Sequence, residues 1–426
     1  MARFIVRGGE ILQGSIRVAG NKNAALAMHA AALLTDEPLV LENVPDIADV
    51  RAMEEILAGL GVSVTRRGST VTLKAASLKT TTVPAASCAR LRGSILMAGP
   101  LAARHGGAVL GPPGGDLIGR RRLDTHLEAL QQLGVEVSVG PRIRLRAGCL
   151  QAREILLDEA SVTATEGVMM AAAVTPGRTV IYHAACEPHV QELGHLLNRM
   201  GAVVEGLGTN RVVVRGRRRL HGARFRVGPD YVEAGSFLAA SIATGGRVTV
   251  TGVRSRVPFL SVLQRGFRRF GVELVQEGDK VRCRHRGPLK VRPDLGGAVP
   301  KLEDGVWPGF PSDLLSIMLV VATAARGTIL FFEKLFESRL YFVDRLIEMG
   351  ARIVQCDPHR VLVSGPSRLH AAHMASPDIR AGMALIAAAL RARGTSVIEN
   401  AEIIDRGYER LDERLRTLGA AVYRDA

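Results

Sequence analysis

Leu60-Gly61-Val62 decides the fold of this chain, because the same pattern returns at Leu133-Gly134, Met200-Gly201, Phe270-Gly271, Met349-Gly350 and Leu418-Gly419. In each copy a large apolar residue is followed by Gly, by Val or Ala, and by a β-rich tail. The copies lie roughly 70 residues apart, which is the spacing of an internal repeat. A Gly after the last apolar turn of a helix is a typical left-handed C-cap. The pattern therefore predicts six units, each with a helix, a stop and a strand.

A second series of segments, rich in Ala and other small apolar residues, runs in phase with the first. Its members are 23–34, 89–103, 163–174, 232–244, 312–325 and 378–390. Strands that open with Gly are expected after four of them, at 177–182, 246–251, 327–332 and 394–398. Helices with so little polar surface are buried rather than amphipathic. This predicts two lobes of three repeats, with helices inside and sheets outside.

The length favours a globular protein of two or three domains, and the lack of a targeting segment indicates the cytoplasm. The chain has 426 residues, of which 47% are hydrophobic, and we expect no membrane insertion because no apolar run is long enough. The N-terminal Met1-Ala2-Arg3-Phe4 lacks a signal-peptide pattern. The five cysteines are scattered without a CxxC pair, so neither a disulfide framework nor a structural zinc site is expected.

The formal net charge of +15 has three interpretations. It fits nucleic-acid binding, a generally arginine-rich composition, or a cationic cleft for a polyanionic small substrate. Only 4% of the residues are aromatic, so stacking platforms for single strands are scarce, and the arginines are mostly dispersed. We therefore favour the arginine-rich composition over nucleic-acid binding, while the cleft is the interpretation that helps to locate a site.

The loop 111–126 concentrates charge in an unusual way. Its Pro and Gly residues predict a tight, mobile turn, with Asp116 at the tip and three arginines at 120–122 behind it. Such a loop could carry an acid–base carboxylate on a lid, with arginines that hold phosphate. A solvated, charged surface loop is the alternative.

Charged residues also stand at predicted helix starts. Lys22 precedes the first buried helix, and Asp378 and Arg380 open the sixth. Helix N-termini favour anions, so Asp378 is expected as a cap. A cation at such a position is electrostatically unfavourable, which indicates an external anion. The same argument applies to Arg339 and Arg406, at the starts of surface helices.

Several common catalytic motifs do not occur in the sequence. There is no Walker A sequence, no GxGxxG between a strand and a helix, no GxSxG elbow and no HExxH pair. Hydride transfer, nucleoside-triphosphate hydrolysis and zinc hydrolysis therefore lack support. What remains is a two-lobed enzyme with a cationic cleft and two candidate carboxylates, Asp116 on the loop and Asp313 at the start of the fifth buried helix.

Six motifs carry a family resemblance. They are Gly20-Asn21-Lys22-Asn23-Ala24-Ala25, Arg90-Leu91-Arg92-Gly93-Ser94, Pro113-Gly114-Gly115-Asp116, Phe310-Pro311-Ser312-Asp313, Phe336-Glu337-Ser338-Arg339 and Asp405-Arg406-Gly407-Tyr408-Glu409-Arg410. In order and spacing the chain resembles the enolpyruvyl transferase family over nearly its whole length, and its closest branch is the one that uses UDP-N-acetylglucosamine. The resemblance implies an inside-out α/β barrel of six βαβαββ-type repeats in two lobes. One lobe would be 22–229 with the loop, the other 1–21 plus 230–426, and the active site would lie in the cleft between them.

The resemblance also implies the reaction and its residues. An enolpyruvyl group would pass from phosphoenolpyruvate to a hydroxyl of a uridine nucleotide or nucleotide-sugar, through a tetrahedral ketal, with release of phosphate. No metal, cofactor, nucleic acid or obligatory protein partner is implied. The implied catalytic residues are Asp116 (loop acid or phosphate release), Asp313 (base for the hydroxyl), Lys22 and Arg406. The implied ligands of phosphoenolpyruvate are Lys22, Arg121 and Arg406 for the phosphate and Arg339 and Arg380 for the carboxylate. The implied acceptor residues are Asn23, Arg92, Arg121, Asp124, His126, Ser161, Val162, Asp313 and Leu335.

Departures from the family pattern bear on the inhibitor and the acceptor. Asp116 stands where many members have Cys, and because a carboxylate is not alkylated as a thiolate is, we expect insensitivity to the epoxide fosfomycin. On the acceptor side, Arg122 replaces a usual Pro, Thr163 a Gly and Cys186 an Arg. The alternatives to UDP-N-acetylglucosamine are therefore another nucleotide, such as the 3′-hydroxyl of UMP in nucleoside-antibiotic synthesis, and a non-catalytic protein that binds anions or nucleic acid.

Overall fold

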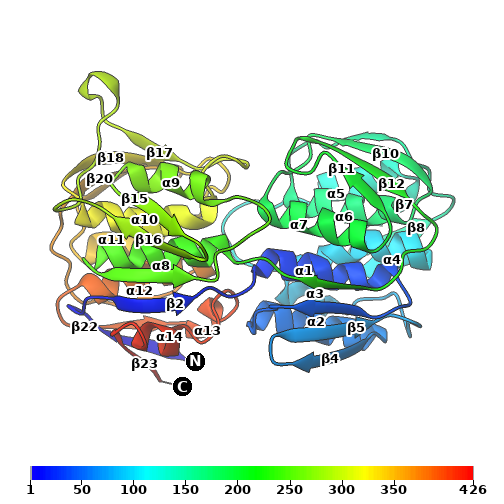
Figure 1. Ribbon diagram of the computed structural model, residues 1–426, viewed down its shortest axis with the longest axis horizontal. Helices are drawn as coiled ribbons and strands as arrows, with labels where there is room; N and C mark the ends of the chain where they lie inside the picture. Colours follow the sequence, from blue (N-terminus) through cyan, green and yellow to red (C-terminus); the bar gives the residue numbers. More distant parts are fainter. Residues whose placement is uncertain (1, 426) are drawn as a thin grey trace. The chain divides into compact units, whose positions relative to one another are not determined.

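Six small sheets organise residues 2–425, the part of the chain that the computed structural model describes. Their contacts group these residues into two units. Unit 1 holds 2–19, 116–120 and 229–425, and unit 2 holds 20–115 and 121–228. Three sheets lie in each unit (Figure 1), so the six repeats predicted from the glycine pattern are present as mixed α/β units.

The sheets of unit 1 have four strands each. In spatial order they are β21 (His373–Ala375), β22 (Thr395–Glu399), β1 (Arg3–Arg7) and β23 (Ala421–Asp425); β15 (Glu273–Glu277), β16 (Lys280–Arg284), β14 (Arg247–Thr251) and β2 (Gln13–Arg17); β17 (Lys301–Glu303), β18 (Gly327–Phe332), β20 (Arg360–Gly365) and β19 (Ile353–Asp357). In each sheet one edge strand pairs in parallel with its neighbour, as β21, β2 and β17 do, and the other pairs are antiparallel.

Unit 2 repeats this plan with one reduction. Its four-stranded sheets are β11 (Val203–Glu205), β12 (Arg211–Gly216), β10 (Gly177–Tyr182) and β9 (Glu154–Leu156); β13 (Ala223–Arg226), β3 (Leu39–Glu42), β5 (Thr70–Lys74) and β4 (Ser63–Arg67). The third sheet has only β6 (Gly107–Leu110), β8 (Ile143–Ala147) and β7 (Val135–Val139). The parallel bridge Thr82↔Val109 stands where the other sheets have a parallel edge strand.

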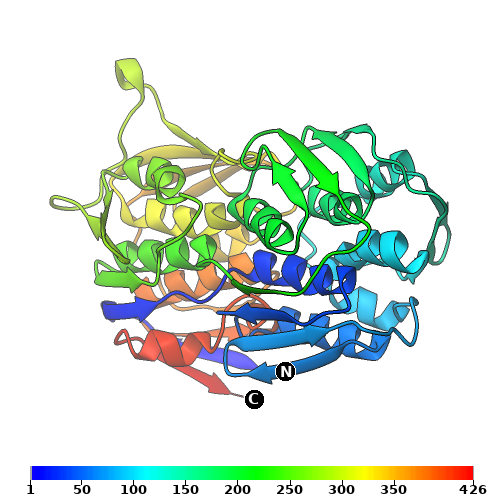
Figure 2. The same cartoon turned by 45° about the vertical axis from the view of Figure 1, so that its right-hand side comes forward.

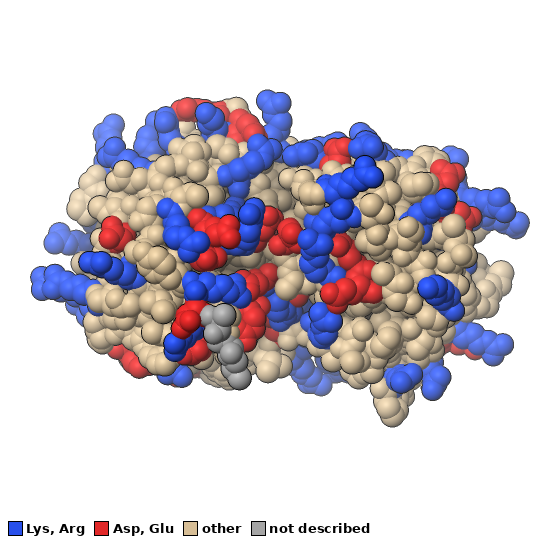
Figure 3. Space-filling view, turned by 90° about the horizontal axis from the view of Figure 1, so that it is seen from below, with Lys and Arg blue, Asp and Glu red and all other residues tan. Residues whose placement is uncertain are grey.

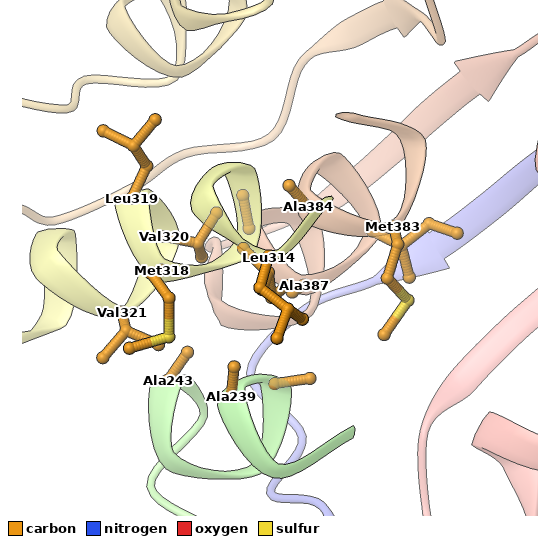
Figure 4. Close-up of a cluster of buried hydrophobic side chains, with 14 of the residues drawn as sticks. Ala239, Ala243, Leu314, Met318, Leu319, Val320, Val321, Met383, Ala384 and Ala387 are labelled. Atoms are coloured by element: carbon orange, nitrogen blue, oxygen red, sulfur yellow. The ribbon is translucent and has the colours of Figure 1, made fainter. Parts of the chain in front are cut away.

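Three helices form the interior of unit 1: α8 (Tyr231–Ala243), α10 (Ser312–Ala324) and α12 (Ile379–Arg391). Figures 1 and 2 show them stacked between the sheets of this unit. Every residue of α8 is buried, as its lack of a polar face predicts. Ala239 and Ala243 of α8 face Leu314 and Met318 of α10 (Figure 4), so small side chains on one helix make room for large ones on the next. Burial of each such Leu or Met side chain contributes about 1.5–3 kcal/mol.

The interior helices of unit 2 are α1 (Lys22–Ala31), α4 (Ala98–His105) and α6 (Val162–Ala173). The single helix predicted over 89–103 is wrong: α3 (Ala85–Arg90) ends early, and a 3₁₀ segment, η2 (Arg92–Met97), precedes α4. Leu91 is extended, with φ −141° and ψ 116°, and buries its side chain. Gly93 packs so closely that a Cβ there would lie 3.2 Å from Leu26 Cδ1. Tertiary packing thus overrides the helix propensity of this Ala-rich segment.

The surface helices end where the glycine pattern predicts. They are α2 (Ala48–Leu60), α5 (Asp124–Gln132), α7 (Pro188–Arg199), α9 (Leu260–Arg268), α11 (Val343–Glu348) and α14 (Leu411–Arg416). The six glycines that follow them all have positive φ: Gly61 106°, Gly134 100°, Gly201 104°, Gly271 74°, Gly350 93° and Gly419 92°. The left-handed C-caps are therefore confirmed, and each turns the chain into the next strand.

The charged loop is divided between the two units. Residues 116–120 belong to unit 1, whereas the sequence placed the whole loop in the lobe 22–229. Ile118 accepts a hydrogen bond from the Ser338 N–H at 3.1 Å, and the Arg120 N–H donates to Glu337 Oε1 at 2.8 Å. Within residues 2–425, no helix combines the length and apolar content that a membrane crossing requires.

Candidate functional site

Asp313 is the centre of a charged cluster in unit 1. It stands in the first turn of α10, next to Ser312. Its Oδ1 accepts a hydrogen bond from Arg339 Nη2 at 3.0 Å, and its Oδ2 accepts one from Arg380 Nε at 3.0 Å. The Asp313 side chain is 29% exposed, whereas those of Arg339 and Arg380 are 4% and 7% exposed. The carboxylate is thus the solvent-facing member of the cluster.

Asp378 caps α12, which confirms the expectation from the sequence. Its Oδ1 accepts from the N–H groups of Arg380 and Ala381 at 2.8 and 2.9 Å. Burial raises the pKa of Asp378 and outweighs the opposing attraction of Arg339. For Arg380, burial opposes the charge, but attraction by the Asp313 carboxylate prevails, so that its pKa lies well above its usual value. Arg380 is therefore a permanent cation at the start of a buried helix.

Three donor nitrogens of this cluster are buried without an acceptor among residues 2–425. They are Arg339 Nε, Arg339 Nη1 and Arg380 Nη1. Buried donors in native proteins nearly always have partners, and a guanidinium fork matches a carboxylate. An anionic ligand with two oxygens is therefore the group that this cluster can bind. Leu335, expected at the acceptor, lies in the turn after β18 and is 41% exposed.

The loop carboxylate is also held in unit 1. Asp116 Oδ1 accepts a hydrogen bond from Arg406 Nη1 at 2.6 Å. Arg406 follows the short helix α13 (Ala401–Ile404). The side chains of Asp116 and Arg406 are 15% and 21% exposed, so this carboxylate is held by an arginine, whereas Leu117 beside it is 90% exposed. In unit 1 the structure thus brings together five of the predicted residues: Asp116, Asp313, Arg339, Arg380 and Arg406.

Lys22 opens α1 in unit 2, and a carboxylate of the same unit, Asp49, pairs with it. Asn21 caps the helix by accepting from the Ala24 N–H at 2.9 Å. Lys22 Nζ lies 2.6 Å from Asp49 Oδ2, and the two side chains are 10% and 6% exposed. Asp49, in the first turn of α2, therefore offsets the unfavourable placement of a cation at a helix start. Asn23, next in α1, is partly exposed.

A second predicted group of unit 2 centres on Arg92. Its Nη2 donates to the carbonyl oxygen of Arg121 at 2.7 Å. Burial, with repulsion from Arg121, lowers the pKa of Arg92 to about 10. Gly115 (φ 116°) packs against Arg92 and Arg121, because a Cβ there would be 2.8 Å from Arg92 Cβ and 3.5 Å from Arg121 Nη1. His126 Nε2 lies 2.6 Å from Thr163 Oγ1, and burial together with Arg92 and Arg121 lowers the pKa of His126 to about 3, so its ring is neutral at pH 7.

The remaining acceptor residues have local partners. Ser161 caps α6, where its side chain accepts from the Ala164 N–H at 3.4 Å, and Val162 is the first residue of that helix. Asp124 opens α5 and pairs with Arg122, whose side chain is 60% exposed. Arg122 thus faces solvent.

Three residues at these groups escaped the sequence analysis: Asp49, Asp304 and Glu333. Asp49 pairs with Lys22. Asp304 and Glu333 are 1% and 0% exposed and lie behind Asp313. Acidic residues at the ends of predicted strands are a usable signal for the last two, but no motif singles them out.

Positive charge does not gather into one surface region on the face seen in Figure 3. Lys and Arg side chains are spread over that face, and Asp and Glu are interspersed among them. Many arginines are paired, for example Arg282 with Glu277 and Arg284 with Glu273. This distribution agrees with an arginine-rich composition and gives no stripe of the kind that tracks a nucleic-acid backbone.

Known proteins resemble the chain over its full length. The family model of EPSP synthase (3-phosphoshikimate 1-carboxyvinyltransferase) matches residues 6–415. The chain is 50% identical over 426 residues to the UDP-N-acetylglucosamine 1-carboxyvinyltransferase of Treponema pallidum, with 100% of both chains covered. It is 49% identical over 424 residues to the protein of the same name from Bradyrhizobium diazoefficiens, covering 99% of this chain and 98% of that one.

Solved structures agree with this similarity. The enolpyruvyl transferase NikO from Streptomyces tendae superposes with a TM-score of 0.86 at 25% identity, covering 99% of this chain and 98% of that one. EPSP synthase from Acinetobacter baumannii superposes with a TM-score of 0.76 at 17% identity over 100% of both chains. The second likeness concerns the fold alone.

Proposed function

The chain belongs to the enolpyruvyl transferase family, and from this premise we propose that it transfers the enolpyruvyl group of phosphoenolpyruvate to the 3-hydroxyl of UDP-N-acetylglucosamine. Inorganic phosphate is the second product. The proposal is carried by one observation: near 50% identity, over essentially the whole chain, to relatives that are named for this acceptor. The reaction is an addition followed by an elimination, and it belongs to the synthesis of peptidoglycan precursors.

Asp313 is the base in this proposal. In the addition, C3 of phosphoenolpyruvate gains a proton while the acceptor oxygen bonds to C2 and gives up its proton. The ketal then loses phosphate from C2 and a proton from C3, which restores the double bond. Arg339 and Arg380 hold the carboxylate of Asp313, and its 29% exposed side chain faces the solvent from which the acceptor hydroxyl approaches.

Cations bind the two anionic groups of phosphoenolpyruvate. The buried nitrogens of Arg339 and Arg380 that lack an acceptor take the carboxylate. Lys22, Arg121 and Arg406 take the phosphate, and Asp49 fixes the ammonium group of Lys22 by their contact of 2.6 Å. Phosphate competes with Asp116 for Arg406, so its arrival and departure are coupled to the loop carboxylate.

The predicted acceptor residues of unit 2 leave one alternative acceptor open. The neutral ring of His126 and the main chain at Ser161 and Val162 suit a polar, uncharged part of the acceptor. Thr163 places a hydroxyl beside His126, where the family pattern has Gly, and this contact favours an acceptor of different shape, such as UMP. The full-length similarity favours UDP-N-acetylglucosamine.

The experiment compares initial rates of phosphate release from phosphoenolpyruvate with each acceptor. We expect release with UDP-N-acetylglucosamine and none with UMP. Asp313→Asn is the matched variant, since it keeps the shape of the side chain and removes the base. Phosphate release with UMP alone would show that UMP is the acceptor. Release that persists in Asp313→Asn would show that Asp313 is not the base.

A further inference from the structure

Two carboxyl groups lie side by side in the interior of unit 1. Asp304 directly follows β17 and Glu333 directly follows β18, and these strands pair in parallel. The ends of parallel neighbours meet at one edge of a sheet, which brings the two side chains together. Asp304 is 1% and Glu333 0% exposed, so two acidic side chains lie buried at neighbouring strand ends.

Two neighbouring carboxyl groups that are both buried cannot both be ionised, because like charges repel and neither is solvated. Asp304 Oδ1 accepts from the Lys334 N–H at 2.5 Å, and Asp304 Oδ2 has no hydrogen-bond partner among residues 2–425. A proton on one carboxyl would let it donate to the other. Burial, with the neighbouring Asp304, raises the pKa of Glu333 to about 9. At neutral pH the pair therefore carries one proton and one negative charge.

Glu333 also joins the two segments that carry Asp313 and Arg339. The Ser312 hydroxyl lies 2.9 and 2.8 Å from its two carboxyl oxygens, and Ser312 directly precedes Asp313. The Phe336 N–H donates to Oε1 at 3.1 Å, in the turn that leads to Arg339. Arg339 Nε stays 3.9 Å from Oε2, outside hydrogen-bond distance.

We propose that Glu333, a buried carboxyl that stands neutral beside Asp304, is a positioning residue for Asp313 and Arg339. A neutral carboxyl fixes both segments through hydrogen bonds without competing as an anion for Arg339. The guanidinium therefore stays directed to Asp313 and to the carboxylate of the substrate. The identity of that substrate rests on the proposed function, whereas the protonation of the pair does not.

The surrounding charges make this arrangement dependent on pH. Arg339 faces Glu333 from the turn before α11, Asp304 lies beside it at the end of β17, and Asp313 lies beyond Arg339 on α10. From the turn before β20, His359 Nδ1 lies 2.7 Å from the Glu333 carbonyl oxygen. When alkaline pH ionises Glu333, the new anion lies near Arg339 and competes with the substrate carboxylate. The affinity for phosphoenolpyruvate is therefore expected to fall through that ionisation.

Three variants of the complete chain test the proposal. Glu333→Ala removes the carboxyl and should raise KM for phosphoenolpyruvate about tenfold or more. Glu333→Gln keeps a neutral group that donates to Asp304, so it should rescue most of that loss and abolish the alkaline rise in KM. Asp304→Asn lets Glu333 ionise at lower pH and should move the rise in KM toward neutrality. Glu348→Gln, an exposed change on α11, is the control.

The outcomes separate this inference from the proposed function. It is overturned if Glu333→Gln is as impaired as Glu333→Ala, or if Glu333→Gln keeps the alkaline rise in KM. Infrared spectra of the substrate-free protein with isotope-labelled Glu give a second readout, because a protonated carboxyl absorbs apart from a carboxylate. A protonated Glu signal that is lost at alkaline pH and is missing from Glu333→Gln supports the pair even if phosphoenolpyruvate is not a substrate. Its absence at neutral pH overturns the inference even if turnover is normal and a variant does not fold.

Discussion

Arg406 donates a hydrogen bond from Nη1 to Asp116 Oδ1 over 2.6 Å, although 290 residues separate the two in sequence. Both side chains are mostly withdrawn from solvent, at 21% and 15% exposure. A charge-assisted hydrogen bond of this kind is stronger than one between neutral groups. The pair therefore fixes the middle of the charged loop to unit 1 and leaves the loop with a carboxylate in place of a reactive thiol.

Fosfomycin should not inactivate this protein. Its epoxide is opened by a thiolate, and Asp116 presents a carboxylate that is already bound by Arg406. Asp116→Cys should gain time-dependent inactivation and the mass of one inhibitor on the peptide that holds 111–123. Intact-protein mass spectrometry measures both, with Cys149→Ser as the control for adducts on an exposed thiol. Covalent inactivation of the unchanged chain, with the adduct on this loop, would contradict the prediction.

Asp313→Asn should lower kcat by about 10²–10⁴-fold, the range for loss of a general base. The change also removes the anion between Arg339 and Arg380, so KM for phosphoenolpyruvate is expected to change as well. Steady-state phosphate release measures both constants. Asp344→Asn, in the first turn of α11 and exposed, is the matched control. If kcat stays the same in Asp313→Asn, another group takes the proton.

Asp49→Asn should destabilise unit 2 and weaken the binding of phosphoenolpyruvate. The change removes the Asp49 charge from the nearly buried ammonium of Lys22, and loss of one member of a buried ion pair costs about 3 kcal/mol. Asp46→Asn is the control in the same segment, because Asp46 pairs with Arg51 at the surface and its loss changes stability by about 0.5 kcal/mol or less. Urea unfolding compares the two variants. Equal stability of both would show that the Lys22–Asp49 contact contributes nothing.

The buried acid pair should give stability a specific pH dependence. The pKa of Glu333 rises from 4.5 to about 9 on folding, so the folded chain holds a proton that the unfolded chain releases between these values. Its stabilising contribution is complete below pH 4.5, falls as pH rises, and is lost above about 9. In this window the unfolding free energy should fall by up to about 1.4 kcal/mol per pH unit more than in Glu333→Gln. Identical slopes for the two chains would contradict a raised pKa.

Gly61→Ala should destabilise the chain by about 1–2 kcal/mol, because Gly61 has φ 106° and L residues avoid that region. A Cβ there would also lie 2.8 Å from the Lys79 nitrogen. A Cβ added at Gly59, two residues earlier in α2, would meet no atom within 4 Å. Gly59→Ala should therefore stabilise the folded chain by about 0.5–1 kcal/mol. Thermal unfolding of the variants Gly61→Ala and Gly59→Ala tests whether the end of this helix needs a glycine. A neutral Gly61→Ala would mean that the stop does not depend on glycine.

The sequence predicted the repeated architecture because its signals are local. Gly61 and its five equivalents need a left-handed backbone, and helices such as α8 have no polar face to present to water. These local signals failed where packing between segments distant in sequence determines the structure. Leu91 interrupts an Ala-rich segment by extending into the core, and 116–120 joins unit 1 through contacts with Ser338, Glu337 and Arg406.

The candidate site was predicted in the same uneven way. Residues within motifs, such as Asp313 and Arg380, could be named from spacing and resemblance, and they lie in one cluster. Their supporting partners could not be named. Asp49 and the pair Asp304–Glu333 depend on which helices and strands become neighbours, and nothing in a single sequence reports that.

The most direct test of the account is the mass of the acceptor after incubation with phosphoenolpyruvate. We expect UDP-N-acetylglucosamine to gain one enolpyruvyl group for each phosphate released, and UMP to remain unchanged. A modified UMP together with unmodified UDP-N-acetylglucosamine would contradict the proposed acceptor. Phosphate release without any modified acceptor would contradict enolpyruvyl transfer itself.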